Sequence, residues 1–316
     1  MRRQLLAVTT LLVAGAACGS ILGIDFPPLR DDGASSDAGD SGLAPMGDSG
    51  PGHAFFSGFE DGGIGEWKAP PGYSNPVLYN LGNPALNELA VASGGDQSAN
   101  RLRVRLEYET STKGAFLAHR IPLAAFGNLS RLEGARLEIF LKLEKLDVEA
   151  GGPVEDAGAA LLGGLLNAPN EAELAGGKLF GPILLVTNDD VYLAVVADLF
   201  NGGQTSALSQ VTIGVDGGAP KLSLARFVNA SWIGATIYSG SRERAIALAY
   251  PCAPKPEAPW VFAGSIGGNA ICIDAANYDI KSIANAATLV IGSLLKGTGG
   301  IAISYDNVTV DVFFRP

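Results

Sequence analysis

Residues 101–109 read RLRVRLEYE, so that every even position is apolar and every odd position is charged. Successive side chains of a β-strand point to opposite faces of its sheet. The period therefore places one row of this stretch in a core and the other row in water. We predict an antiparallel strand with one wet face.

The alternation recurs in residues 136–144, RLEIFLKLE, where only Phe140 interrupts the polar row. Beyond this stretch the apolar residues move from odd to even positions, at Leu146 and Val148. A change of parity inside a strand indicates an extra residue that the partner strand does not match. We predict a β-bulge near Lys145.

More stretches of strand-forming residues follow, separated by Gly, Asn and Asp turns. They are residues 182–187, 191–199, 211–215, 222–224, 233–238, 244–250, 287–295 and 301–314. In the last stretch the parity changes after Tyr305, which predicts a second bulge at Asp306 and Asn307. Many short strands with turns between them indicate an all-β protein, a two-sheet antiparallel sandwich or jelly roll.

Composition narrows the classes of function. The chain has 316 residues, a formal net charge of −10 and only two His. Nucleic acid is not expected as a partner, because such binding depends on Lys and Arg. Two imidazoles leave little for acid–base or metal chemistry. Residues 53–316 have no gap long enough for a linker, so we predict one β-sandwich domain.

The N-terminus predicts export. Residues 1–4 are basic, and residues 5–17 are uncharged but too short to span a bilayer as a helix, so residues 1–17 are read as a signal peptide. Gly15-Ala16-Ala17-Cys18 resembles the lipobox of bacterial lipoproteins, which implies acylation of Cys18. Ordinary cleavage after Ala17 is the alternative. Gly19 implies, by the sorting rule of that family, an outer-membrane location.

Residues 18–52 follow as a stretch rich in Gly, Asp, Ser and Ala. Such a composition buries too little apolar surface to offset the entropy of ordering the chain. We predict a flexible acidic linker between the lipidated cysteine and the domain.

The two ends of the domain carry a family resemblance. Residues 55–62, FFSGFEDG, with Trp67 shortly after, resemble the opening strand of concanavalin A-like (laminin-G-type) jelly rolls. Residues 303–311, ISYDNVTVD, resemble the closing strand of the same folds. Shorter galactose-binding-like modules share both signatures, but the length favours the larger fold. The resemblance implies that the first and last strands are neighbours.

The resemblance also implies a structural metal ion. In related modules an acidic residue at each of these ends helps to hold Ca²⁺, whose preferred ligands are carboxylate and carbonyl oxygens. Glu60 and Asp306 are the matching residues, and no other cofactor is expected. The alternative is that Glu60 is solvated and Asp306 caps the bulge.

Cys252 and Cys272 are the thiols that remain after lipidation. In an oxidising compartment we predict a disulfide between them, closing a stiff surface loop. A reactive thiol pair or a metal site is the alternative, but no His lies nearby.

No catalytic residue is predicted. Enzymes on this fold usually carry a Glu-x-Asp-x-x-Glu order, whereas Glu144, Asp147 and Glu149 follow a different order and fit a solvated strand end. Sugars generally bind exposed aromatic residues with a few polar groups. Trp260 and Tyr73, which lie among Pro and Gly, are the predicted ligand-binding platforms.

These observations predict a lipid-anchored surface protein of the cell envelope. Its sandwich would bind a glycan or a protein partner, with the membrane as a second partner through the lipid, and it would not be an enzyme. A polysaccharide-degrading hydrolase or lyase is the alternative from another class. A purely structural envelope lipoprotein is the third possibility.

Overall fold

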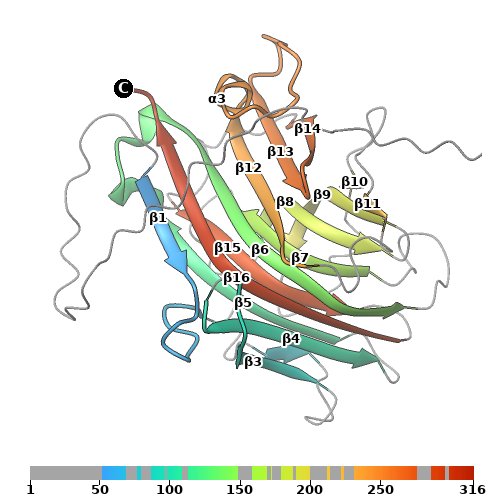
Figure 1. The fold of residues 1–316 in the computed structure, drawn as a ribbon. Helices are drawn as coiled ribbons and strands as arrows, with labels where there is room; N and C mark the ends of the chain where they lie inside the picture. The colour runs from blue at the N-terminus through green and yellow to red at the C-terminus, as the bar shows by residue number, and fades with distance from the viewer. Residues whose placement is uncertain are drawn as a thin grey trace, which may run out of the picture. The chain divides into compact units, whose positions relative to one another are not determined.

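The structure is a computed structural model, and strands dominate it (Figure 1). It describes residues 52–68, 77–79, 87–96, 98–108, 113–148, 159–168, 172, 179–187, 190–199, 212–213, 222–223, 231–275, 286–295 and 299–316. In this part of the chain, no helix has the length and apolar character needed to cross a membrane. The predicted signal peptide, Cys18, the linker up to residue 51 and Tyr73 lie outside the described residues.

The first sheet, sheet A, has eight strands in the order β14-β13-β12-β6-β16-β4-β3, with β1 also paired to β16. All of its pairings are antiparallel. The bounds are β1 Gly52–Ser57, β3 Glu88–Ser93, β4 Asn100–Tyr108, β6 Leu132–Val148, β12 Ile233–Ser241, β13 Trp260–Ile266, β14 Asn269–Asp274 and β16 Gly299–Phe314.

The second sheet, sheet B, also has eight antiparallel strands, in the order β10-β9-β8-β7-β15-β5-β2, with β11 also paired to β9. The bounds are β2 Val77–Tyr79, β5 Lys113–Pro122, β7 Ala159–Leu166, β8 Leu179–Thr187, β9 Asp190–Leu199, β10 Thr212–Ile213, β11 Leu222–Ser223 and β15 Ala286–Leu295.

One apolar core holds side chains from both sheets. Leu102, Val104 and Leu106 of β4 are fully buried in it, as the alternation of residues 101–109 predicts. Leu117 of β5 and Leu289 of β15 enter the same core from sheet B. The predicted all-β, two-sheet antiparallel sandwich is therefore confirmed.

Both predicted bulges are present where β16 pairs with β6. Ala302 pairs with Lys145 and Ile303 with Leu143, so one residue of β6 is extra there. A second shift falls between Asp306 and Thr309. Asn307 at that shift has a left-handed backbone, with φ of 46°. The predicted closeness of the first and last strands is also confirmed, because β1 pairs with β16.

A buried polar contact links the two sheets. Tyr305 of β16 is fully buried, and its hydroxyl donates to the carbonyl oxygen of Gly292 on β15 at 2.6 Å. Gly292 has φ of +138°, and a Cβ there would lie 2.2 Å from the carbonyl oxygen of Ala115. Burial raises the pKa of Tyr305, so its hydroxyl stays protonated and remains a donor.

The expectation of a strand at residues 244–250 is wrong. The chain forms helix α3, Arg242–Ala247, directly after β12. Ser241 caps the helix by accepting from the backbone N–H of Arg244, and Glu243 lies in its first turn. A capping serine followed by an acidic residue favours a helix start over a continued strand. Two short 3₁₀ turns, η1 Leu123–Ala125 and η2 Leu129–Arg131, connect β5 to β6.

The predicted disulfide between Cys252 and Cys272 is confirmed, with an S–S distance of 2.03 Å. It joins the segment after α3 to β14, the last strand on that side of sheet A. Arg242 strengthens the same region, because its guanidinium donates to the carbonyl oxygens of Ala253 and Ala258 and pairs with Asp274.

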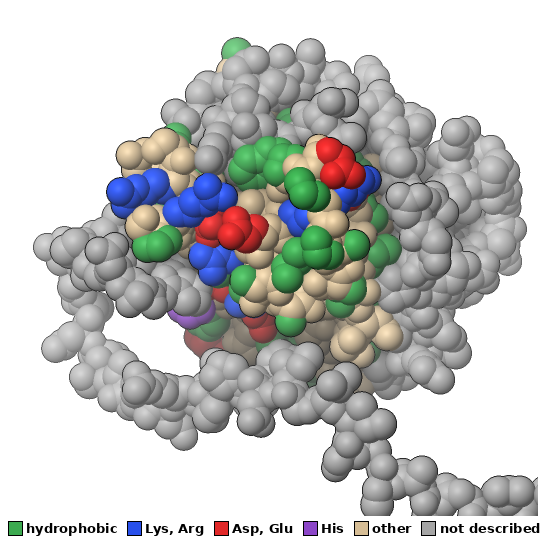
Figure 2. Space-filling view, turned by 90° about the horizontal axis from the view of Figure 1, so that it is seen from above, with side chains coloured by type: hydrophobic (Ala, Val, Ile, Leu, Met, Phe, Trp, Pro, Cys, Tyr) green, Lys and Arg blue, Asp and Glu red, His purple; other side chains and the backbone are tan. Residues whose placement is uncertain are grey.

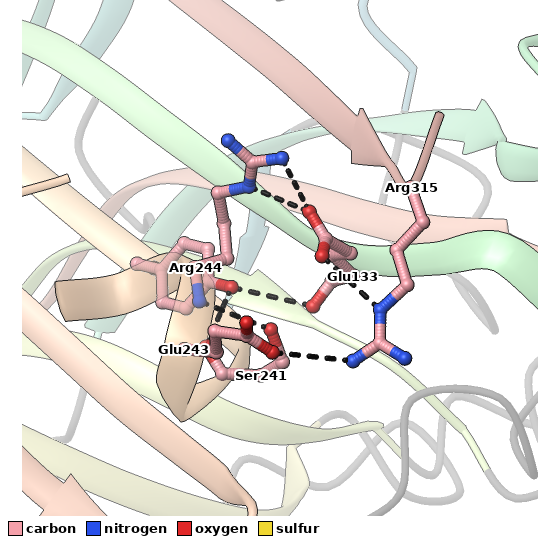
Figure 3. A network of polar contacts seen from close by, with 6 residues as sticks. Glu133, Ser241, Glu243, Arg244 and Arg315 are labelled. Atoms are coloured by element: carbon pink, nitrogen blue, oxygen red, sulfur yellow. Dashed lines mark hydrogen bonds and ion pairs between the residues drawn. The ribbon is translucent and has the colours of Figure 1, made fainter. Parts of the chain in front are cut away.

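A buried glutamate ties α3 and the C-terminus to sheet A (Figure 3). Glu133 of β6 accepts from Arg244 Nε at 2.6 Å and from Arg315 Nε at 3.3 Å. Glu243 adds one longer contact, 3.5 Å, to Arg315.

Side chains of both charge signs lie next to one another on the face seen in Figure 2, with hydrophobic side chains beside them.

We predict that Glu133→Gln lowers the free energy of unfolding by about 2 kcal/mol. The substitution removes the negative charge at this buried site, and so weakens the hydrogen bonds that Arg244 and Arg315 donate to it. Glu243→Gln is the matched control, since this side chain is 83% exposed and its loss costs at most about 0.5 kcal/mol. Urea unfolding of the purified chain measures both. Equal stability of the two variants would contradict the assignment.

Candidate functional site

Part of the outer face of sheet B is covered, although Arg120 and Pro122 at the end of β5 are exposed. Four apolar residues of sheet B alternate with core residues and so lie on the opposite side of the sheet from the core: Phe116 of β5, Val290 of β15, and Ile183 and Leu185 of β8. All four are nevertheless buried, with at most 1% exposure. These four side chains are therefore not available to a ligand.

A pocket of about 240 Å³ lies at the end of β1. It is lined by Phe55, Phe56, Ser57, Gly58, Phe59, Glu60, Asp61, Gly63, Gly65 and Glu66. Phe56 is 62% exposed, while its neighbour Phe55 is buried in the core. The pocket thus combines an exposed phenyl ring with three carboxylates.

Buried aromatic rings hold the loop that forms this pocket. Trp67 is 2% exposed, contacts the rings of Phe55 and Phe59, and donates from Nε1 to Ser57 Oγ at 3.0 Å. The next residue, Lys68, exchanges two backbone hydrogen bonds with Ala118 of β5. The loop is therefore fixed at β1 of sheet A and at β5 of sheet B.

The three carboxylates differ in their surroundings. Asp61 Oδ1 accepts from the backbone N–H of Gly63 at 3.0 Å. Glu66 is 76% exposed, and its Oε2 lies 3.9 Å from His119 Nε2. Glu60 accepts from the backbone N–H of Ala99 at 3.3 Å. Asp61 thus has one backbone hydrogen bond that favours one orientation, whereas Glu66 has only the longer contact with His119.

His119 supports the pocket from behind. Its ring stacks on Phe55 with centroids 4.0 Å apart, and its Nδ1 lies 3.3 Å from the carbonyl oxygen of Glu66. Burial lowers the pKa of His119, so the ring is neutral near pH 7. This histidine holds the loop in place rather than lining the cavity.

The two residues predicted to hold calcium come together in a neighbouring cluster. Asp306 is fully buried, and its Oδ2 accepts from Asp96 N at 2.6 Å and from Ser98 Oγ at 2.5 Å. Its Oδ1 accepts from Asn307 N at 2.8 Å. Burial, together with the charge of Glu60, raises the pKa of Asp306 against the effect of these hydrogen bonds.

This arrangement does not by itself form a calcium site. Three N–H and O–H donors already occupy both oxygens of Asp306. No group of three or more His, Cys, Asp or Glu residues among those described is placed to hold a metal ion. Asp306 acts here as the acceptor that holds the loop at Asp96 and Ser98, and calcium remains a prediction from the resemblance.

Glu144 is not a solvated strand end. It lies on the outer face of sheet A, where it pairs with Arg101 and Arg103 and accepts from Ser304 Oγ at 2.8 Å. Burial alone would raise the pKa of Glu144, but the Ser304 hydrogen bond and the two arginines outweigh it and lower the pKa. The side chain of Asp147 and all of Glu149 lie outside the described residues.

Of the two predicted ligand platforms, the structure describes only Trp260, which begins β13. Its side chain is half-buried and packs against the main core. Of the groups that line the β1 pocket, the sequence predicts only Glu60 as a site residue, as a calcium ligand, and does not predict Phe56, Asp61 or Glu66. One signal was available, because adjacent residues of a strand point to opposite faces, so Phe55 and Phe56 cannot both enter the core.

Comparison with known proteins gives no family for this chain. No family model matches, and no curated protein matches. Solved structures do match, and one of them is an endo-β-1,4-glucuronan lyase from Trichoderma reesei. The match has 11% sequence identity and a TM-score of 0.44, and it covers 82% of this chain and 95% of the lyase chain.

Two further matches are a Bacteroides ovatus mixed-linkage glucan GH16 protein in complex with a product and the alginate lyase vAL-1 from a Chlorella virus. The first has 12% identity, covers 81% of this chain and 99% of that chain, and has a TM-score of 0.41. The second has 8% identity, covers 72% of this chain and 90% of the alginate lyase chain, and has a TM-score of 0.39.

These matches contradict the expectation of a non-enzymatic protein, because they include lyases and a GH16 protein with its product. At identities of 8–12% the likeness concerns the fold and transfers no catalytic residue to this chain. Any site must therefore be argued from the residues of this chain.

We predict that Asp306→Ala lowers the free energy of unfolding by about 2–3 kcal/mol, because three partly buried donors lose their acceptor. Asp61→Ala is the control, since it loses only one exposed hydrogen bond and costs about 0.5 kcal/mol or less. Chemical denaturation measures both variants. An Asp306→Ala variant as stable as the parent would show that this cluster does not hold the loop.

Proposed function

We propose that this chain is a polysaccharide-degrading protein of the cell envelope and that the β1 pocket is its active site. The pocket supports this proposal by placing an exposed phenyl ring beside Glu60, Asp61 and Glu66. Sugars bind to aromatic faces through their C–H groups and to carboxylates through their hydroxyls. Both kinds of group are available in one cavity.

Hydrolysis suits the pocket better than elimination. Cleavage of a glycosidic bond by water needs two carboxyl groups, one to protonate the leaving oxygen and one to act as base or nucleophile. Asp61, oriented by its bond from Gly63, fits the base or nucleophile, and Glu66 fits the acid. A lyase instead breaks the glycosidic bond by elimination next to a uronate carboxylate, and this needs a cation to neutralise that carboxylate. The residues that line the pocket include no Lys, Arg or His.

The location belongs to the same proposal. Gly15-Ala16-Ala17-Cys18 supports acylation of Cys18, and residues 18–52 support a flexible acidic linker. Two or three acyl chains would hold the protein firmly, at ~0.8 kcal/mol per buried CH₂. The sandwich would then act on polysaccharide at the outer membrane, within reach of its linker.

The catalytic part of the proposal is tested with the Cys18→Ser chain, which cannot be acylated. We expect it to release reducing ends from a neutral polysaccharide such as mixed-linkage β-glucan. Asp61→Asn and Glu66→Gln should each slow this release about 100-fold or more, the usual effect of losing an acid or base.

Glu88→Gln is the control for this assay, because this carboxylate lies on β3 outside the pocket and is 37% exposed. It should retain the parent rate. Absence of reducing ends from neutral polysaccharides, or equal rates in all three variants, would overturn the assignment of the pocket.

The anchor is tested separately by fractionating cells that express the chain. We expect the parent in the membrane fraction, labelled by a fatty-acid probe, and Cys18→Ser in the soluble fraction without label. Acyl label that persists in Cys18→Ser would refute lipidation at this residue.

A further inference from the structure

Two phenylalanines lie on the outer face of sheet A, outside the main core and outside the buried cluster that Tyr238, Tyr250 and Phe313 form on part of that face. Phe56 of β1 is 62% exposed, and only Ile246 joins it as a large exposed apolar side chain in the described residues. Phe140 of β6 is half-buried and interrupts a row that otherwise holds charged residues. Apolar rings on a solvent-facing sheet indicate a surface that contacts something else.

The strand register places polar residues beside these rings. Phe56 pairs with Thr309 of β16, Thr309 with Glu138 of β6, and Glu138 with Thr236 of β12. Thr236 pairs in turn with Ser265 of β13. At about 4.8 Å between strands, this row of five residues extends about 19 Å across the sheet. We call it the transverse row.

Phe140 adds a second ring beside the transverse row. It is two residues beyond Glu138, about 7 Å further along β6. Its partner on β12 is Gly234, which puts no side chain next to the ring, and a Cβ there would lie 3.9 Å from it. The Phe140 ring therefore lies beside this glycine and is half-buried there.

Hydrogen bonds fix the polar groups of the row. The hydroxyls of Thr236 and Ser265 are 2.8 Å apart, and Tyr250 donates to Thr236 Oγ1 at 2.8 Å. The carboxylate of Glu138 is 31% exposed. Of the polar groups of the row, only Thr309 and the Glu138 carboxylate lie between Phe56 and Phe140. A carboxylate between two rings matches a ligand that alternates C–H faces with hydroxyl groups, as a saccharide chain does.

The local charge indicates which saccharide fits. The carboxylates of the adjoining pocket repel anionic sugars, whereas Glu138 in the row lies 3.7 Å from Arg136 Nη2. Arg136 is the cation next to the row, but its Nη2 bonds to the buried Asp311 at 2.6 Å. His53 also faces Asp311, with Nδ1 at 2.7 Å from Oδ1. Arg136 and His53 are thus both engaged by Asp311, while Lys142, on the same face of β6, lies outside the transverse row.

We propose that the transverse row, together with Phe140, binds an extended neutral polysaccharide and leads it to the β1 pocket. This deepens the proposed function by naming the substrate class, and it rests on that function only for the cleavage that follows binding. Phe56 belongs to both regions, so a chain bound along the row reaches the pocket directly.

The test measures binding without cleavage, in the Cys18→Ser chain that also carries Glu66→Gln. Affinity electrophoresis compares mixed-linkage β-glucan with alginate, a polyuronate. We expect retardation by the glucan and none by alginate. Phe56→Ala and Phe140→Ala should each weaken glucan binding about tenfold, the loss of roughly one aromatic contact.

Lys142→Ala is the matched control, because this residue lies on the same face of β6, two positions beyond Phe140. It should leave glucan affinity unchanged, and near-UV circular dichroism checks that every variant is folded. Stronger binding of alginate, unchanged affinity in Phe140→Ala, or no glucan binding by the parent would overturn the proposal. Binding without any release of reducing ends would instead refute only the catalytic role of the pocket.

Discussion

The structure depends on the pairing of its last strand. β16 pairs with β6 along one edge, and along the other it pairs first with β4 and then with β1. The change of partner falls at the bulge of Asp306 and Asn307, where the register with β6 also shifts. Because β16 is the only strand that pairs with β1 among the described residues, this short ladder places Phe56 and the pocket loop that follows it.

Much of the fold follows from local pattern. The alternation in residues 101–109 and 136–144 predicts which faces are buried, and the changes of parity locate both bulges of β16 and β6. The order of the strands does not follow, because it depends on contacts between residues far apart in the chain. Residues 244–250 were misread because their apolar residues suit a strand, while the cap that starts the helix lies just before them, at Ser241.

The candidate site is harder to predict from the sequence than the strands are. Carboxylates of a loop give no periodic signal, and only the folded loop brings Asp61 and Glu66 to one cavity. Glu144 looked solvated because its partners, Arg101, Arg103 and Ser304, come from two other strands. Phe140 was visible as an irregularity in the polar row, but its meaning depends on Gly234 and Glu138, which pairing places beside it.

The central claim is that sugar is bound on the β1 side of sheet A. The most direct test is a crystal structure of the chain with a neutral β-glucan oligosaccharide. The account predicts sugar rings over Phe56 and Phe140, with hydroxyls at Glu138 and one end of the chain in the pocket beside Asp61 and Glu66. Sugar bound against sheet B, or a pocket and sheet face that stay free of sugar while it binds elsewhere, would contradict the account.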